Sequence, residues 1–266
     1  MSVVARRAPW GGLIFACACA CASASAASSS SAAETPEHCA LLRKHGQAAG
    51  AQACFAALVR QAERAPPAEA DYLRAEGHWG LGQYDDANRE FRDAVTRADR
   101  SALYRVRWGM LLRERFNDPD AEALFKEALV RDPKSARAYL GLALVSEDGY
   151  DDHAIEWVRK ALEIDPKLVE AHELLANLAL EDSDPQQAAR EADAALALSP
   201  DALDAMAVHA SIELLADRSP DRWFERVHAI NPGYGEAYAT VAHHLILNLR
   251  YKEGIAYYRK AVAVNP

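Results

Sequence analysis

Proline recurs along the chain at nearly constant intervals, and this period restricts the fold more than any other feature. The dipeptides Asp132-Pro133, Asp165-Pro166, Ser199-Pro200, Asn231-Pro232 and Asn265-Pro266 place their prolines 33, 34, 32 and 34 residues apart. Proline ends a helix because it lacks a backbone N–H and its ring clashes with the preceding turn. Such a period predicts an array of similar units rather than one globular core.

Each unit reads as two amphipathic helices. In the last unit, one stripe of residues at helical spacing is followed by a second stripe; these are Tyr238, Val241, Ala242 and Leu245, then Tyr251, Gly254, Tyr258 and Ala261. Small residues within the stripes let two helix backbones approach closely. The composition agrees, since 50% of the residues are hydrophobic but only 8% are aromatic. Alanine-rich, charged sequence of this kind favours closely packed helices.

The pattern resembles the tetratricopeptide repeat, which pairs two helices in a unit of about 34 residues. The matching small residues of the first helices are Ala75, Gly109, Ala143, Ala176, Ala210 and Ala242. Those of the second helices are Ala87, Ala121, Ala154, Ala188 and Gly254, then Ala94, Ala128, Ala161, Ala195 and Ala261. The resemblance implies an all-α fold, an α-solenoid of stacked helix-turn-helix repeats wound as a right-handed superhelix.

The organisation expected from this resemblance has four parts. Residues 1–26 are a signal peptide, 27–36 a flexible linker, 37–66 a degenerate helical hairpin, and 67–266 an array of about six repeats. The array ends on Pro266 without a capping segment, so apolar residues such as Val262 are left uncovered. Repeat arrays need polar terminal caps. We therefore expect either self-association through the last repeat or a chain that continues.

The first residues carry the marks of export. Arg6 and Arg7 are followed by an apolar stretch over residues 10–22, and Ala24-Ser25-Ala26 fits a cleavage site. The stretch is shorter than the roughly 20 residues of a membrane span, and the mature chain is expected to have no transmembrane segment. We therefore predict a periplasmic or secreted protein. The alternative is a lipoprotein acylated at Cys17.

Two cysteines remain after such a cleavage, Cys39 and Cys54. Both fall on helical patterns that flank an expected turn at residues 46–50. An even cysteine count in an oxidising compartment favours a disulfide, and the axial mismatch across the hairpin is small enough for one. We predict a Cys39–Cys54 disulfide. The alternative is a pair of buried thiols.

Residue patterns for catalysis are missing from the sequence. There is no phosphate-binding loop, nucleophile elbow or dinucleotide glycine motif. His172-Glu173 begins like a zinc-peptidase helix, but the second histidine is replaced by Ala176 and Asn177. A single histidine cannot hold zinc. We therefore predict no enzyme, no cofactor and no metal.

Ligands of the repeat family usually lie in a concave groove lined by the first helices. Carried over, the groove residues are Tyr72, Glu76, Trp79, Arg137, Leu140, Glu147, Glu170, Glu173, Asn177 and His243. His244, next along the helix, points about 100° away and is expected to be exposed. The groove is acidic with apolar islands, so it should prefer an extended peptide or helix that carries basic and apolar side chains.

The predicted function is a non-catalytic scaffold for protein–protein interaction. The net charge of -9 argues against a nucleic-acid partner. A second hypothesis is that this chain is the N-terminal repeat portion of a larger secreted metallopeptidase, whose catalytic domain would lie beyond residue 266. That hypothesis rests on analogy, because the chain itself carries no peptidase residues.

Overall fold

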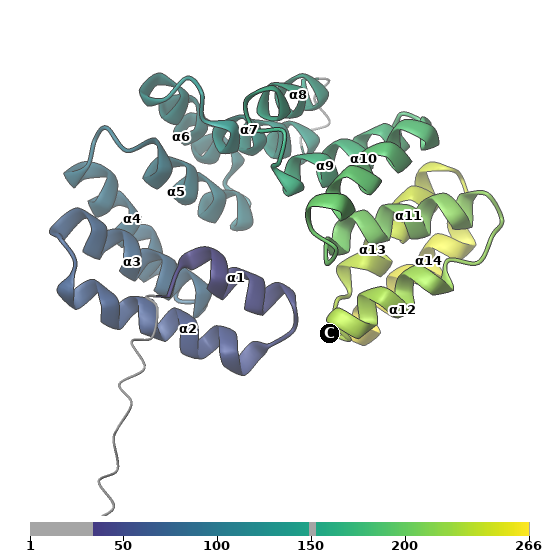
Figure 1. The fold of residues 1–266 in the computed structure, drawn as a ribbon, viewed down its shortest axis with the longest axis horizontal. Coiled ribbons are helices and arrows are strands. Elements are labelled where there is room, and N and C mark those ends of the chain that lie inside the picture. The colour runs from purple at the N-terminus through teal and green to yellow at the C-terminus, as the bar shows by residue number, and fades with distance from the viewer. Residues whose placement is uncertain (1–33, 149–152, 266) are drawn as a thin grey trace, which may run out of the picture. The chain divides into compact units, whose positions relative to one another are not determined.

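Residues 34–148 and 153–265 are described by a computed structural model, and within them all of the regular structure is helical (Figure 1). Fourteen α-helices follow one another in consecutive pairs within these ranges. Their bounds are α1 Pro36–Lys44, α2 Ala48–Gln61, α3 Pro67–Gly80, α4 Tyr84–Arg97, α5 Ala102–Glu114, α6 Asp118–Arg131, α7 Ala136–Asp148, α8 Ala154–Ile164, α9 Val169–Glu181, α10 Pro185–Leu198, α11 Leu203–Leu215, α12 Asp221–Ile230, α13 Glu236–Leu247 and α14 Tyr251–Val264. A short 3₁₀ helix, Ala62–Arg64, follows α2. The predicted all-α solenoid is confirmed.

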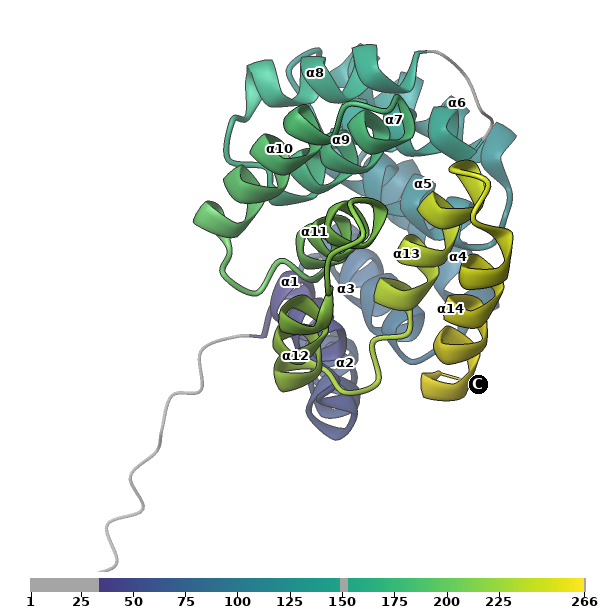
Figure 2. The same ribbon diagram turned by 90° about the vertical axis from the view of Figure 1, so that its right-hand side faces the viewer.

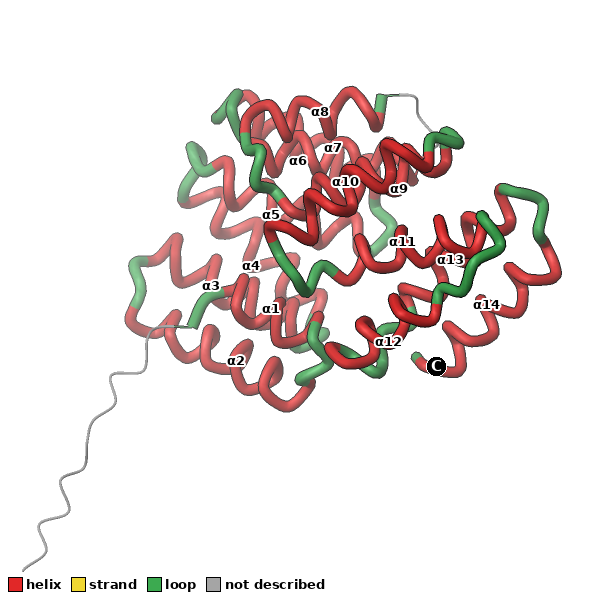
Figure 3. Tube along the Cα trace, turned by 45° about the vertical axis from the view of Figure 1, so that its right-hand side comes forward, coloured by secondary structure: helices red, strands yellow, loops and turns green. Residues whose placement is uncertain are grey.

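Tight turns join the two helices of a pair, and Figure 3 shows them as short loops between the helices. Where the turn is described, one residue adopts a left-handed conformation; these residues are Gly46, Gly82, Phe116, Ser183, Asp217 and Leu249. At Gly82, its own N–H donates to Trp79 O at 3.0 Å and the next N–H donates to His78 O at 2.8 Å. This arrangement satisfies the last carbonyl groups of the helix, so the turn ends α3 without loss of hydrogen bonds.

Between pairs, the recurring Asp-Pro and Asn-Pro dipeptides form a second kind of turn. The side-chain oxygens of Asp132 and Asp165 accept from the N–H groups two residues on, each at 3.0 Å. Asn231 accepts from Gly233 N in the same way at 2.9 Å. The acidic or amide side chain thus fixes the turn, and the proline after it ends the helix. This is the physical origin of the period in the sequence.

Packing between pairs depends on small residues facing large ones. A Cβ added at Gly109 or at Gly141 would lie 2.7 or 2.4 Å from the ring of Phe125, so only glycine lets α5 and α7 approach that ring. Phe125 is completely buried as a result. The apolar core forms a series of clusters along the described array rather than a single centre.

The first hairpin contacts helices that come far later in the chain. Asn231, in the loop between α12 and α13, donates its Nδ2 to Lys44 O at 3.0 Å. Lys44 Nζ also lies 3.2 Å from the carboxylate of Asp204 on α11. Figure 2 shows α1 beside α11 and α12. The array therefore curves until its first hairpin touches its sixth.

Candidate functional site

Two adjoining pockets open among the first helices of the later pairs. The first has a volume of about 280 Å³ and the second about 380 Å³. The first is lined by Lys44, Leu144, Glu147, Glu170, Glu173, Leu174, Asn177, Asp204, Val208 and Thr240, and the second by Glu147, Asn177, Glu181, Ala239, Thr240, His243 and Tyr258. Glu147, Asn177 and Thr240 border both, so the two pockets form one continuous site. We call it the acidic site.

Five of the predicted groove residues line the acidic site. They are Glu147 on α7, Glu170, Glu173 and Asn177 on α9, and His243 on α13. Arg137 lies beside it, with its guanidinium 3.5 Å from Glu170. Leu140 is buried in the core under α7. The stacking of α7, α9 and α13 thus gathers residues that are separated by as many as 96 positions in the sequence.

One wall of the acidic site is a cluster of ionisable side chains around Lys44. Its Nζ lies 3.4 Å from Glu173 and 3.2 Å from Asp204. Glu173 also accepts from the Ala205 N–H at 3.4 Å, and Asp204 accepts from the hydroxyl of Tyr234. Only 5% of the Glu173 side chain is exposed, so its charge is largely removed from water.

The surroundings of this cluster shift its pKa values. Burial, followed by the nearby Asp204 carboxylate, raises the pKa of Glu173 to about 7. Burial alone would lower the pKa of Lys44, but the attraction of Asp204 and Glu173 outweighs it and the pKa is raised. Burial and Asp204 also raise the pKa of Tyr234. Lys44 is therefore firmly charged, while Glu173 titrates near neutral pH.

Asn177 organises the other wall. Its Nδ2 donates to Glu147 and to Glu181, each at 3.1 Å. Its Oδ1 lies 2.9 Å from Nε2 of His244. His243 Nε2 lies 3.1 Å from Glu181, and this hydrogen bond raises the pKa of His243. The amide thus holds two carboxylates in place at the mouth of the site.

The expectation that His244 is exposed is wrong. Its side chain is completely buried between α13 and α9, and burial, followed by the neighbouring His243, lowers its pKa to about 4. The reason is the position of α13 in the stack, where it packs against both α11 and α9. His244 therefore faces the protein interior, whereas His243, on the adjacent face of α13, lines the acidic site.

The remaining predicted groove residues gather at the other end of the array, around Arg107. Its guanidinium binds the carboxylate of Glu76 at 2.5 and 2.7 Å and lies 4.8 Å from the ring of Trp79. Tyr72 is buried beside this pair and stacks on Tyr104. Only 1% of the Glu76 side chain is exposed. The Glu76 carboxylate is therefore already paired with Arg107 inside the fold.

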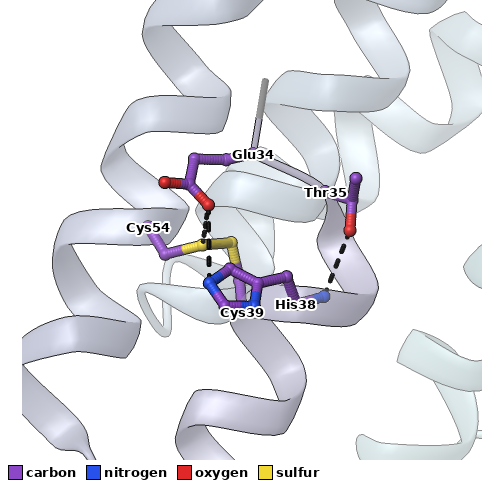
Figure 4. Close-up of a disulfide and its surroundings, with 5 residues drawn as sticks. All are labelled: Glu34, Thr35, His38, Cys39 and Cys54. Atoms are coloured by element: carbon purple, nitrogen blue, oxygen red, sulfur yellow. Dashed lines mark hydrogen bonds and ion pairs between the residues drawn. A yellow bond between two sulfur atoms is a disulfide. The ribbon is translucent and has the colours of Figure 1, made fainter. Parts of the chain in front are cut away.

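The predicted disulfide joins Cys39 on α1 to Cys54 on α2, with 5.4 Å between the Cα atoms. The turn between these helices covers residues 45–47, so α2 begins within the segment expected to be turn. Figure 4 shows the carboxylate of Glu34 and the imidazole of His38 beside the sulfur of Cys54. A disulfide sulfur has no thiolate to offer a metal, so this group is not a metal centre.

Sequence reasoning missed several residues of the acidic site, above all Lys44, Thr240 and Tyr258. Thr240 and Tyr258 belong to the last pair, α13 and α14. Lys44 belongs to the first hairpin, which the sequence predicts only as a degenerate hairpin ahead of the array. No local sequence pattern indicates that Lys44 lines the acidic site, because its position there depends on the curvature of the five pairs that follow it.

Comparisons with known proteins agree with this architecture. The sequence profile of the tetratricopeptide repeat matches residues 106–168, which run from α5 to the start of α9. Residues 106–168 therefore carry the tetratricopeptide (TPR) repeat, and the other described helices share its arrangement in consecutive pairs. TPR repeat proteins are typically non-catalytic scaffolds, and the repeat suggests protein or peptide partners. No curated protein matches the chain in sequence.

Solved structures share the fold. A thermophilic TPR protein of Thermus thermophilus, TTC0263, is 22% identical, with a TM-score of 0.55 over 69% of this chain and 100% of that one. A chain of the APC/C hetero-tetramer Cut9–Hcn1 is 14% identical, with a TM-score of 0.67 over 87% of this chain and 46% of that one. A monomeric mutant of IFIT1 with m7Gppp-AAAA is 17% identical, with a TM-score of 0.61 over 87% and 59%. At these identities the likeness shows the fold alone.

The helices themselves bear on membrane insertion. Among those in the described ranges, none combines the length and the apolar character needed to cross a membrane.

Proposed function

We propose that this protein is a scaffold that binds an extended peptide or a helix of another protein at the acidic site. The observation that carries the proposal is the convergence of carboxylates from three helices on one pocket. Glu147 comes from α7, Glu170 and Glu173 from α9, and Asp204 from α11, whereas Lys44 is the one basic residue among the described residues that line this first pocket. A pocket with this balance favours a guest that carries positive charge.

The pocket also offers apolar surface. Leu144, Leu174 and Val208 lie among the carboxylates in its lining. A basic side chain flanked by apolar ones would pair with the acids and cover these residues at the same time. The ligand class that fits is therefore a basic and apolar segment of a protein. A nucleic acid is disfavoured, because its phosphates would meet the same carboxylates.

Fluorescence anisotropy with two labelled peptides tests this proposal. One peptide alternates lysine and leucine, and the other alternates glutamate and leucine at the same length. We expect only the basic peptide to bind, with an affinity that falls as salt is added. Replacing Glu147→Gln and Glu170→Gln together should weaken binding about tenfold, since each exposed ion pair contributes up to roughly 1 kcal/mol.

The matched control replaces two acids outside the site. Glu122→Gln and Glu156→Gln remove carboxylates that pair with Lys126 and Lys160 on the exposed faces of α6 and α8. This double variant should bind as the unaltered protein does. Equal binding of both peptides, or equal loss in both double variants, would show that the acidic site does not select the ligand.

We further propose that the protein acts in the periplasm or outside the cell. The Cys39–Cys54 disulfide supports this, since disulfides persist mainly in oxidising compartments. The proposed signal peptide lies outside the described residues. Cell fractionation and intact-mass measurement of the native protein test the proposal. A chain that starts after Ala26 supports export, an acylated Cys17 identifies a lipoprotein, and a cytoplasmic chain with reduced cysteines contradicts both.

A second candidate function is association through α14. Tyr251, Ile255, Tyr258 and Val262 follow one another at helical spacing and are all exposed. In earlier pairs, α5 packs against α4 and α7 packs against α6, so a further helix from a second copy fits this face. Under the metallopeptidase hypothesis, the covering helix would belong to a later domain instead. Light scattering with Ile255→Glu separates them, because a self-associating protein should become monomeric.

A further inference from the structure

The first hairpin makes a specific contact with the fifth and sixth hairpins, although 129 to 187 residues separate the partners. On one side are Lys44, His45 and Gly46; on the other are Glu173, Asp201, Asp204 and Asn231. We call this the closing contact. His45 Nε2 lies 2.8 Å from Asp201, and a Cβ added at Gly46 would lie 2.5 Å from Asn231 Oδ1. The two surfaces therefore fit closely.

The closing contact is polar. It consists of ion pairs and of the hydrogen bond from Asn231 to Lys44 O at 3.0 Å. Water reaches it, since 33% of the Lys44 side chain and 42% of the Asp204 side chain are exposed. The exposed pair of Lys44 and Asp204 contributes little free energy, whereas separating Lys44 from the buried Glu173 carboxylate costs more. These ion pairs and the hydrogen bond can open without dismantling an apolar core, unlike the interfaces between successive pairs.

The helix that carries Lys44 of the closing contact, α1, is short and buries few side chains. α1 has nine residues, of which only Pro36 and Cys39 are buried. A helix of this length is not stable in water by itself. α2, in contrast, packs along α3 and buries Phe55 and Leu58. α1 packs on α2 and α3, with Leu42 against the core cluster, and the Cys39–Cys54 bond adds a covalent tie between α1 and the firmly packed α2.

We infer that the first hairpin is a disulfide-held latch, which fastens the start of the array to its fifth and sixth hairpins and releases when the disulfide is reduced. Lys44 lines the acidic site, so the fastened latch also completes one wall of that site. Release is a two-electron reduction by a dithiol. The S–S bond breaks, Cys39 and Cys54 each gain an electron and a proton, and the dithiol becomes a disulfide.

Amide hydrogen exchange of the full oxidised chain, before and after reduction, tests the latch. The reporters are the Gly233 N–H, which donates to Asn231, and the Ala205 N–H, which donates to Glu173. We expect reduction to speed exchange in α1 and at these reporters several-fold, with α5 to α8 unchanged. Unchanged exchange at the reporters would overturn the latch, and faster exchange along the whole array would overturn it too, by making the disulfide a general staple.

A charge variant examines the same contact without touching the cysteines. Lys44→Met keeps the aliphatic stem but removes the ammonium group, so the oxidised variant should show faster exchange at Ala205 and Gly233. The control is Lys126→Met, because Lys126 pairs with Glu122 on the exposed face of α6. If Lys44→Met exchanges as Lys126→Met does, the ion pairs do not fasten the hairpin and the inference is wrong.

Discussion

Burial of His244 makes the protein sensitive to acid, and the structure sets the size of the effect. Nε2 of His244 lies 2.9 Å from Asn177 Oδ1, so it is the nitrogen that donates. Nδ1 is buried and has no hydrogen-bond partner within the described residues. Protonation would place a second N–H there, beside His243 and away from water. For these reasons the pKa of His244 is lowered to about 4.

A lowered pKa means that the unfolded chain binds the proton first. The stability that neutral His244 contributes is complete above pH 6.5, its unfolded pKa, and is lost as the pH falls toward about 4. The two pKa values differ by 6.5 - 4 = 2.5 units. At about 1.4 kcal/mol per unit, the loss amounts to about 3 kcal/mol.

Urea unfolding of the unaltered protein and of His244→Gln, at several pH values from 4 to 7.5, measures this loss. Glutamine retains a donor near the position of Nε2 but does not titrate. The variant should be less stable at pH 7.5, because its packing is altered, and the gap should narrow by about 3 kcal/mol toward pH 4. His38→Gln is the control, since His38 is exposed. Parallel curves for His244→Gln and the unaltered protein would refute the reasoning.

Three further outcomes follow from particular contacts. Glu173→Gln should gain stability relative to the unaltered protein as the pH rises from 4.5 through 7. The raised pKa of Glu173 means that the stability contributed by its protonated form is lost over that range. A constant difference between the two proteins in urea unfolding would contradict this. Phe116→Gly should raise the free energy of unfolding by about 1 kcal/mol, and Gly82→Ala should lower it by a similar amount. Both residues have positive φ, and Gly82 has open space around it. If thermal unfolding showed that both substitutions change the stability in the same direction, backbone strain would be ruled out as the cause. Gly141→Ala should cost about 1 to 3 kcal/mol, because its Cβ would press on Phe125; a neutral change would mean that the ring can move aside.

Most of the fold could be predicted from the sequence because the interfaces between successive pairs are local and repeated. The side chains of Asp132, Asp165 and Asn231 accept the hydrogen bonds that close the turns between pairs, and a proline directly follows each of these residues. Gly109 and Gly141 fit around the single ring of Phe125. Such contacts join neighbouring pairs only, so a period in the sequence is enough to reveal them.

The acidic site could be predicted only in part. Glu147, Glu173 and Asn177 were found because their place on a first helix decides which way they face. Lys44 could not be found, since its position accumulates the small rotations of every pair between α1 and α11. His244 was misplaced for a related reason, because α13 packs against α9 as well as against its nearest first helix, α11.

A comparison of two of the buried carboxylates, Glu76 and Glu173, bears on the proposed ligand site. The carboxylate of Glu76 pairs with Arg107, 31 residues later in the chain, through two hydrogen bonds that join successive pairs of helices. The carboxylate of Glu173 pairs with Lys44, 129 residues earlier in the chain, through a single contact of 3.4 Å to the ammonium nitrogen. The first partnership persists as long as the neighbouring pairs stay folded, whereas the second depends on a distant hairpin remaining fastened. Under the proposed function, a basic ligand side chain would compete with Lys44 for Glu173, so binding at the acidic site, rather than near Arg107, would be coupled to the position of the first hairpin.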